Sequence, residues 1–311
     1  MYTYIRFLFS VLVSCDYYAT SEYDNGIQMS AFGTIENTEF ATQYEQSERV
    51  KQIRRLNPES CVDDKKDINI LRNRMFYEAE QTLLKNKDTN IAFIEAPTGA
   101  GKSNLAMNCS LKLLDKNINK IFYVYPFNTL VEQNYDTLEK IYGQTDIFKS
   151  IAVINSITPI PLNGTRKFWE NLDKEENEKF YQKALLDRQF LNYPFILTTH
   201  VNLFQIMFGC EREAAISFYQ LAGSVVVLDE IQSYKNVLWT EIMMFLQCYS
   251  KLLNMKIIIM SATLPKLDML TGNHEKVVNL IENPENIFRT HVLRKEWHCR
   301  MNCFIRIKRL K

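Results

Sequence analysis

The cysteines of this 311-residue chain form no pattern that is typical of a disulfide framework. Seven are scattered over positions 15, 61, 109, 210, 248, 299 and 303, and no two are spaced as C-x-x-C. Dispersed thiols of this kind are usual in the reducing environment of the cytosol. The sequence therefore predicts a cytoplasmic protein whose stability rests on a packed core.

An excess of one charge and a long apolar run are also lacking. The 37 Lys and Arg nearly balance the 36 Asp and Glu, so a nucleic-acid surface must be a local patch. Without an apolar run of about 20 residues, no membrane span is expected. The apolar stretch Phe7–Val13 is short for an export signal, and we expect a buried helix there that ends near Asp16.

What the chain does contain is an alternation of short apolar runs with longer segments of helical periodicity. Its 46% of apolar residues suffices for a packed core. The alternation predicts an α/β fold with a mostly parallel sheet that helices cover on both faces. Strands are expected at 91–94, 120–125, 151–155, 195–199, 224–228 and 256–260, with a weaker one at 277–281. Helices are expected at 45–56, 68–84, 104–114, 128–141, 167–191, 201–208, 237–253 and 265–270.

The stretch 95–103, with the sequence EAPTGAGKS, lies between an expected strand and an expected helix. That order is the context of a phosphate-binding loop, although Ala96 stands where the usual pattern has its first glycine. Gly99 and Gly101 allow successive backbone N–H groups to point inward and, with the helix N-terminus, to cradle an anion. We predict an ATP site formed by Pro97, Thr98, Gly99, Ala100, Gly101, Lys102 and Ser103.

Within this loop, two side chains have expected chemical roles. Lys102 can reach the β- and γ-phosphates, and the Ser103 hydroxyl can ligate Mg²⁺. A second apolar strand ends in Asp229 and Glu230, which we expect to hold the same Mg²⁺ and to polarise the attacking water, respectively. The predicted catalytic residues are Lys102, Asp229 and Glu230, and the predicted metal ligands are Ser103 and Asp229.

A third strand ends in the sequence Ser261-Ala-Thr263. Its two hydroxyl groups are expected to hydrogen-bond Glu230 or Gln232 and so to report the state of the γ-phosphate. We therefore predict that Ser261 and Thr263 couple hydrolysis to motion, and that Gln232 lies at the nucleotide.

Two further loops leave strands at the same expected edge of the sheet. They place hydroxyl groups, amides and helix N-termini where a nucleic-acid backbone could lie. The alternative is that each loop simply caps the start of a helix, and for His200 a capping or backbone contact is favoured over metal ligation. The candidate nucleic-acid contacts are Pro126, Asn128, Thr129, Gln133, Thr199, His200 and Asn202.

Taken in order, the sequences APTGAGKS, YPFNTLVEQ, TTHVNL, LDEIQ and SATLP resemble motifs I, Ia, Ib, II and III of a superfamily 2 helicase. Their wording is similar to that of the CRISPR-associated helicase-nuclease of type I systems. The resemblance implies a RecA-like fold and the following division of the chain: 1–19, the last helix of an HD nuclease domain; 20–66, a linker; 67–288, the first RecA-like helicase domain; 289–311, a basic tail.

The same resemblance implies ATP-driven movement along single-stranded DNA, recruitment by a guide-RNA surveillance complex, and a role in antiviral defence. Several departures from the family limit this. The only histidines are at 200, 274, 291 and 298, so the clustered ligands of the nuclease are missing and no nuclease activity is expected. The glutamine that reads adenine in many relatives would fall near Met75. Motifs of the second RecA-like domain, including its arginine finger, do not occur in these 311 residues, so we expect very weak turnover.

Two other functions are compatible with these motifs. One is an RNA helicase of the DEAD-box type, which is disfavoured because Ile231-Gln232 follows the acidic pair where that type has Ala-Asp. The other is a catalytically impaired fragment that holds ATP and nucleic acid without turning over. DNA-stimulated ATP hydrolysis separates an active motor from the impaired fragment.

Overall fold

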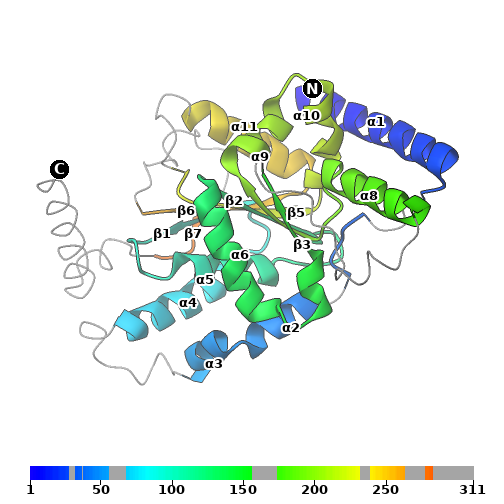
Figure 1. Ribbon diagram of the computed structural model, residues 1–311. Helices are drawn as coiled ribbons and strands as arrows, with labels where there is room; N and C mark the ends of the chain where they lie inside the picture. Colours follow the sequence, from blue (N-terminus) through cyan, green and yellow to red (C-terminus); the bar gives the residue numbers. More distant parts are fainter. Residues whose placement is uncertain are drawn as a thin grey trace, which may run out of the picture.

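A computed structural model describes residues 1–27, 32–36, 38–55, 68–155, 174–231, 239–262 and 277–282. In this part of the chain, seven strands form one sheet in the order β3-β4-β2-β5-β6-β1-β7, and every neighbouring pair is parallel. The expected RecA-like α/β fold is thus confirmed (Figure 1). The strands are β1 (Ile91–Glu95), β2 (Lys120–Tyr125), β3 (Ile151–Ile154), β4 (Phe195–Thr199), β5 (Ser224–Leu228), β6 (Lys256–Ser261) and β7 (Val277–Asn279).

Helices bury both faces of the sheet, which explains why its strands are continuous apolar runs. Along β2, Ile121 and Tyr123 belong to the hydrophobic cluster on one face, whereas Phe122 and Val124 belong to the cluster on the other. The first face is covered by α2 (Glu39–Gln46), α3 (Glu48–Arg55), α4 (Ile68–Lys85), α5 (Lys102–Lys112) and α6 (Asn128–Tyr142). The second is covered by α9 (His200–Phe208), the 3-10 helix η2 (Ser217–Leu221) and α11 (Trp239–Leu252). The short helix α10 (Arg212–Ile216) packs on α9, η2 and α1.

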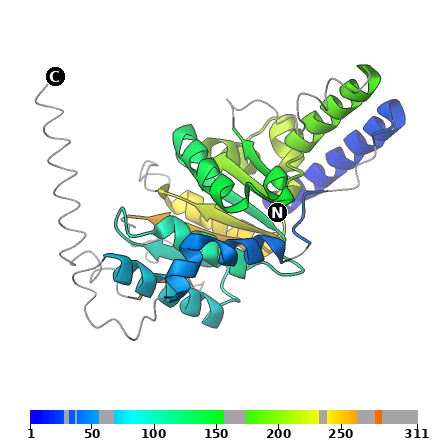
Figure 2. The same cartoon turned by 60° about the horizontal axis from the view of Figure 1, so that its bottom comes forward.

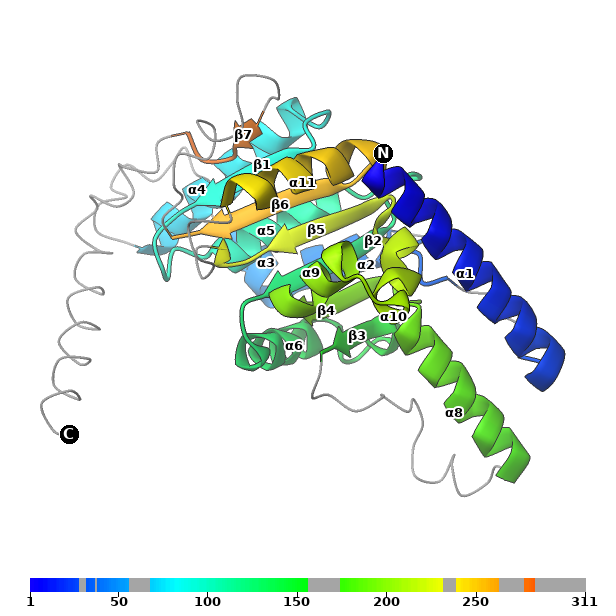
Figure 3. The ribbon, with the colours of Figure 1, turned by 90° about the horizontal axis from the view of Figure 1, so that it is seen from above.

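The first helix, α1 (Tyr2–Asn25), is longer than expected. The sequence predicted an end near Asp16, but the helix continues to Gly26, which adopts the left-handed conformation of a helix cap (φ 64°). Tyr17 and Tyr18 support the extra turns by packing on Phe190 at the end of α8 (Lys174–Gln189). In Figures 2 and 3, α1 and α8 project together from the sheet.

The single helix expected over 45–56 is two helices. Ser47 interrupts the helix between α2 and α3, because its ψ of 142° is extended and its hydroxyl donates to the Tyr44 carbonyl. Residues placed in a linker from sequence, including Phe40, Tyr44 and Val50, are buried in the core. How the chain divides into domains stays a prediction, and the expected helix at 265–270 and tail at 289–311 lie outside the described residues.

The strands β2 and β6 each begin with a buried lysine. These lysines lie at the amino end of the sheet, opposite the end that carries the glycine-rich loop and the acidic pair. Lys120 Nζ donates to the carbonyl oxygens of Phe32 (3.0 Å) and Leu191 (2.9 Å) and to Gln220 Oε1. Lys256 Nζ likewise donates to the Lys87 and Thr89 carbonyls. Burial lowers the pKa of Lys120 from 10.5 to about 7. The side-chain nitrogens of these lysines satisfy carbonyls that the sheet itself cannot pair.

We predict that Lys120→Met removes a pH dependence from the folding stability. Between pH 7 and 10.5 the unfolded lysine binds a proton that the folded one does not, so the parent gains up to about 1.4 kcal/mol per pH unit as pH rises. Urea unfolding at pH 7.5, 8.5 and 9.5 measures this slope. The exposed Lys116→Met variant should keep the slope of the parent, and an unchanged slope in Lys120→Met would contradict the assignment.

Candidate active site

The glycine-rich loop joins β1 to α5 at the carboxyl end of the sheet. Gly99 and Gly101 have φ values of 85° and 90°, in the left-handed region that side chains disfavour, and Gly101 is the N-cap of α5. Ala96 N–H donates to the Ser261 carbonyl at 3.2 Å, which attaches the loop to the end of β6. The first turn of α5 carries buried Lys102 and exposed Ser103.

The acidic pair predicted from sequence is next to this loop. Because β6 alone separates β1 from β5, the chain brings Glu230 Oε1 to 3.5 Å from Lys102 Nζ. The same ammonium donates to the Ala96 carbonyl at 2.9 Å. Three of the predicted residues, Lys102, Asp229 and Glu230, are therefore juxtaposed at one edge of the sheet.

Asp229 is held in an environment that penalises its charge. The residue is 8% exposed, and burial, with the neighbouring Glu230 carboxylate, raises the pKa of Asp229 from 3.8 to about 6. The Lys102 ammonium and the Glu230 backbone oppose this shift without cancelling it. A buried carboxylate is a ligand suited to a hard divalent cation, which would offset the cost of ionising Asp229.

Glu230 has a strained backbone. Its φ of 47° lies in the left-handed region, which non-glycine residues rarely adopt. Strain of this kind costs roughly 1–3 kcal/mol and persists where the surrounding structure imposes it. At this position the strained conformation places the Glu230 carboxylate near Lys102.

Sequence reasoning missed Arg72, which α4 places against the loop. Arg72 Nε and Nη2 donate to the Gly99 carbonyl at 3.0 and 2.6 Å. Local periodicity predicted the helix but not this contact, because Arg72 and Gly99 are 27 positions apart in the sequence. The Met75 side chain, near which the resemblance would place an adenine-reading glutamine, is buried in the core.

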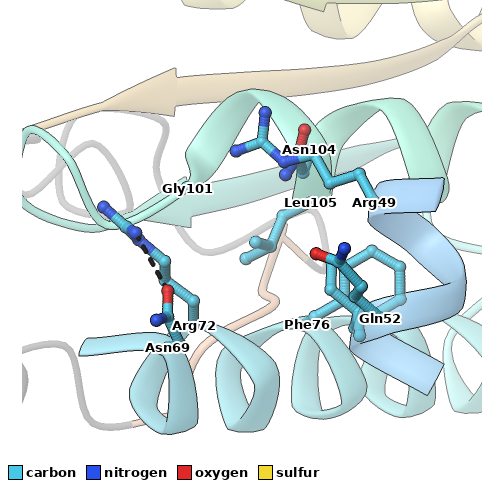
Figure 4. Close-up of a pocket in the computed structure, with 9 residues that line it drawn as sticks. Arg49, Gln52, Asn69, Arg72, Phe76, Gly101, Asn104 and Leu105 are labelled. Atoms are coloured by element: carbon cyan, nitrogen blue, oxygen red, sulfur yellow. Dashed lines mark hydrogen bonds between the residues drawn. The ribbon is translucent and has the colours of Figure 1, made fainter. Parts of the chain in front are cut away.

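Arg72 also lines a pocket of about 260 Å³ between α3, α4 and α5 (Figure 4). Arg49 and Gln52 face it from α3, and Gly101 and Asn104 face it from the loop and α5. With its amide oriented toward Arg49, the Asn104 oxygen accepts from Nε at 2.7 Å and Nη2 at 3.0 Å. No lining residue is acidic, and two are arginines, so the pocket is electropositive.

A charged network fixes the helices around this pocket. Arg54 of α3 donates to Glu45 of α2 and to Glu80 of α4, at 2.8 and 2.7 Å. Asn108 and Lys112 of α5 bond the same two carboxylates. Arg54 thus joins α2, α3 and α4, and the two carboxylates connect this group to α5. The network is partly buried, where such bonds are stronger than at a fully exposed surface.

Of the seven candidate nucleic-acid residues, two are exposed, four are half-buried and one, His200, is buried. Thr129 and Gln133 of α6 are exposed, whereas the Thr199 hydroxyl caps α9 by accepting from Asn202 N–H at 3.4 Å. The Asn202 amide donates to Thr198 Oγ1 at 2.9 Å. Pro126 and Asn128 are half-buried at the start of α6.

His200 is 1% exposed, so its imidazole faces the protein interior. Burial lowers the pKa of His200 to about 4, and contact with the Asp229 backbone partly opposes this. We therefore do not assign His200 a contact with nucleic acid. Its position favours the backbone-contacting role that the sequence suggested, between the end of β4 and the acidic pair.

Exposed apolar side chains that the sequence did not single out lie at the same edge. Tyr125 of β2 pairs in register with Thr199 of β4, and two residues beyond each are Phe127, 61% exposed, and Val201, 70% exposed. Both lie at helix N-termini, whose free N–H groups suit phosphates.

Of the coupling residues, Ser261 is buried at the end of β6, beside Glu95 in register. Gln232 and Thr263 lie outside the described residues. Among described residues, no group of three or more His, Cys, Asp or Glu is placed to hold a metal ion. The described helices also include none that is long and apolar enough to cross a membrane.

The fold and the site define a class of protein. A family model described as DEAD/DEAH box helicase matches residues 77–270, which is more than half of the chain. The chain belongs to the DEAD/DEAH box helicase family.

Its relatives include a more particular group. The chain is similar to a CRISPR-associated nuclease/helicase, Cas3, from Haloferax volcanii, with 23% identity over 188 residues. That match covers 57% of this chain and 19% of the relative, so the chain spans about a fifth of that protein's length.

Solved structures of helicases are similar to parts of the chain. Cas3 of T. fusca with AMPPNP has a TM-score of 0.45 and 21% identity, covering 61% of this chain and 21% of that one. The DUF1998 helicase MrfA bound to DNA has a TM-score of 0.42 and 17% identity, covering 66% of this chain and 25% of that one. The helicase domain of Pyrococcus furiosus Hef has a TM-score of 0.40 and 16% identity, covering 68% and 39%.

We predict that Asp229→Asn stabilises the protein at neutral pH. The folded pKa of about 6 exceeds the unfolded 3.8, so ionisation of Asp229 costs on the order of 3 kcal/mol above pH 6. The gain should shrink as pH falls through 6 toward 4, where the parent carboxyl is protonated. Urea unfolding at pH 7.5, 6 and 4.5 tests this, with exposed Asp136→Asn as the control. A loss of stability in Asp229→Asn at pH 7.5 would refute it.

Proposed function

We propose that this chain is the ATP-binding motor domain of a DNA helicase or translocase that moves on single-stranded DNA. The observation that supports it best is the juxtaposition of Lys102, Asp229 and Glu230 at the end of β1 and β5, beside a loop whose glycines permit an anion cradle. Membership of the DEAD/DEAH family supports ATP as the nucleotide.

Each residue then has a separate task. The loop N–H groups and Lys102 bind the phosphates, and Lys102 must turn from the Ala96 carbonyl toward them. Ser103 and Asp229 would hold Mg²⁺, which when bound neutralises charge on the phosphates. Glu230 accepts a proton from the attacking water and orients it.

The electropositive pocket between α3, α4 and α5 would hold the nucleoside. Arg72 bonds the carbonyl of the Gly99–Ala100 peptide, so it fixes the orientation of that peptide in the cradle. Because amides and guanidinium groups line the pocket, base contacts would come from Gln52, Asn69 and Asn104 in place of the missing glutamine.

Single-stranded DNA would cross the N-termini of α6 and α9. Asn128, Thr129, Gln133 and the helix N–H groups contact phosphates in this proposal, while the exposed rings and methyl groups of Phe127 and Val201 contact bases. Such contacts are tolerant of sequence, as a translocating motor requires.

By its likeness to Cas3, the chain would act in type I CRISPR defence in the cytoplasm, recruited by a guide-RNA surveillance complex. Hydrolysis would need a second RecA-like domain across the cleft, because Lys102, Ser103, Asp229 and Glu230 approach the nucleotide from one side. Turnover by residues 1–311 alone would then be very slow, and no nuclease activity is proposed.

A second candidate is a catalytically impaired domain that binds ATP and nucleic acid without useful turnover. The observation that favours it is the Lys102 ammonium, which is already engaged by Ala96 and Glu230. Supplying a second RecA-like domain as a separate polypeptide separates the candidates, since only a motor would gain DNA-stimulated hydrolysis. The RNA helicase alternative predicts stimulation by RNA in the same assay.

We predict that Lys102→Ala abolishes tight ATP binding, whereas Glu230→Gln keeps binding and loses turnover. Lys102 contacts phosphates in the ground state, while Glu230 acts on the water during reaction. Equilibrium binding of a fluorescent ATP analogue with Mg²⁺ measures the first effect, and single-turnover hydrolysis with the partner domain measures the second. Exposed Lys116→Ala is the control. If Lys102→Ala binds the ATP analogue with the same affinity as the parent, the assignment of the nucleotide site is wrong.

We also predict that Phe127→Ala weakens binding of single-stranded DNA roughly 5- to 150-fold, since a base stacked on an aromatic ring contributes about 1–3 kcal/mol. The loss should be similar for unrelated sequences, because every base offers a stacking face. Fluorescence anisotropy with labelled oligonucleotides at fixed salt measures it. Tyr23→Ala, an exposed aromatic at the far end of α1, should leave the affinity unchanged. If both variants bind like the parent, the stacking role is wrong.

A further inference from the structure

Two buried tyrosine hydroxyls donate to consecutive carbonyls in the first turn of α5. Tyr123 of β2 donates to the Ser103 carbonyl at 3.3 Å, and Tyr44 of α2 donates to the Asn104 carbonyl at 3.1 Å. A carbonyl oxygen has two lone pairs, so each can accept a hydroxyl in addition to its partner within the helix. Both tyrosines are 3% exposed. The turn that carries the predicted Mg²⁺ ligand Ser103 is therefore held from two sides.

This first turn does not receive the usual support from its own N-cap. The N-cap is Gly101, and no side chain there accepts a hydrogen bond from the first N–H groups of the helix. Helices normally gain such a bond from Ser, Thr, Asp or Asn. At Gly101 the φ of 90° favours glycine instead, because the loop needs this conformation. The position of Ser103 therefore depends on contacts from other elements.

The strand β2 also holds the second predicted metal ligand. Asp229 N–H donates to the Val124 carbonyl at 2.9 Å, and Val124 directly follows Tyr123. The strand itself lies beside β5 near the centre of the sheet (Figure 3). The Tyr123 ring is fixed in turn by stacking on the Tyr125 ring, with centroids 5.0 Å apart and 15° between the planes. Adjacent residues of one strand thus contact the backbone at Asp229 and at Ser103.

We propose that Tyr123 is a positioning residue for Mg²⁺, because its hydroxyl fixes the place of Ser103 relative to Asp229. The inference rests on the proposed function, in which these two residues hold the metal. Mg²⁺ demands near-ideal octahedral geometry, so its binding depends on how its ligands are placed. Removing a group that orients a metal ligand typically lowers metal affinity about 10- to 100-fold. The bond from Tyr123 is long and acts on the Ser103 backbone, so we expect a smaller effect.

Two other buried tyrosines provide matched comparisons. The Tyr142 hydroxyl donates to the Phe40 carbonyl at 3.0 Å, so Tyr142→Phe removes a bond of the same kind that does not involve α5. Tyr44→Phe loosens the same turn at Asn104, whose side chain lines the electropositive pocket. We therefore expect Tyr44→Phe to change nucleotide affinity equally with and without metal.

The test compares the dissociation constant of a fluorescent ATP analogue in EDTA with that in excess Mg²⁺, on the whole 311-residue chain. The ratio of the two constants measures how much the metal strengthens binding. In Tyr123→Phe this ratio should fall about 3- to 10-fold, while the constant in EDTA stays within about twofold of the parent. Tyr44→Phe and Tyr142→Phe should keep the parent ratio. Thermal unfolding checks that each variant is folded.

A double substitution shows whether Tyr123 acts through Ser103. Adding Tyr123→Phe to Ser103→Ala should leave the ratio where Ser103→Ala alone puts it, because the effects of coupled residues do not add. A further fall in the double variant overturns the inference. An unchanged ratio in Tyr123→Phe also overturns it, as does an equal fall in Tyr44→Phe, since the turn would then be loosened in general.

The same measurements separate this inference from the proposed function. If the parent binds the analogue equally well in EDTA and in Mg²⁺, the role of Tyr123 is wrong and the nucleotide site stands. If the parent binds the analogue in neither condition, the proposed function is wrong and the inference falls with it.

Discussion

Burial of the central strands on both faces is the constraint on which the rest of this structure depends. A strand with helices on either side has no face to offer to water, so its polar chemistry must lie where it begins or ends. At the beginnings, Lys120 and Lys256 extend their ammonium groups to backbone carbonyls. At the ends, the glycine loop, the acidic pair and Ser261 meet. The same constraint thus places the lysine hydrogen bonds at the amino end of the sheet, here called the anchoring edge, and the candidate site at the carboxyl end, here called the chemical edge.

The chemical edge works against the stability of the fold. Asp229 is ionised at neutral pH only at a cost, Glu230 has a strained backbone, and Lys102 is drawn between a carbonyl and a carboxylate. These are costs that phosphates and a divalent cation would relieve, and binding energy of this kind also stabilises the folded state. The charged network around Arg54 and the packed core on both faces of the sheet lie outside the site, and they offset these costs in the free energy of folding.

The helix α1 is attached to the rest of the protein mainly through polar contacts. Its inner side is attached by hydrogen bonds from Arg6 and Ser10 to carbonyls of α9, α10 and the turn after α9, and Val13 packs inward with Phe190 and Ile216.

The sequence by itself determined the strands, the loop and the acidic pair, because each depends on neighbours within a few residues. Apolar runs of four to six residues identified β1 to β6, and the glycines at 99 and 101 predicted the left-handed turns that the structure contains. Tertiary structure alone decided the rest. It placed β6 between β1 and β5, so that Glu230 meets Lys102 across more than 120 positions of sequence. It brought Arg72 to Gly99, turned His200 inward, and carried α1 past Asp16 onto Phe190. These outcomes depend on which surfaces far apart in the sequence pack together, and local periodicity does not predict such contacts.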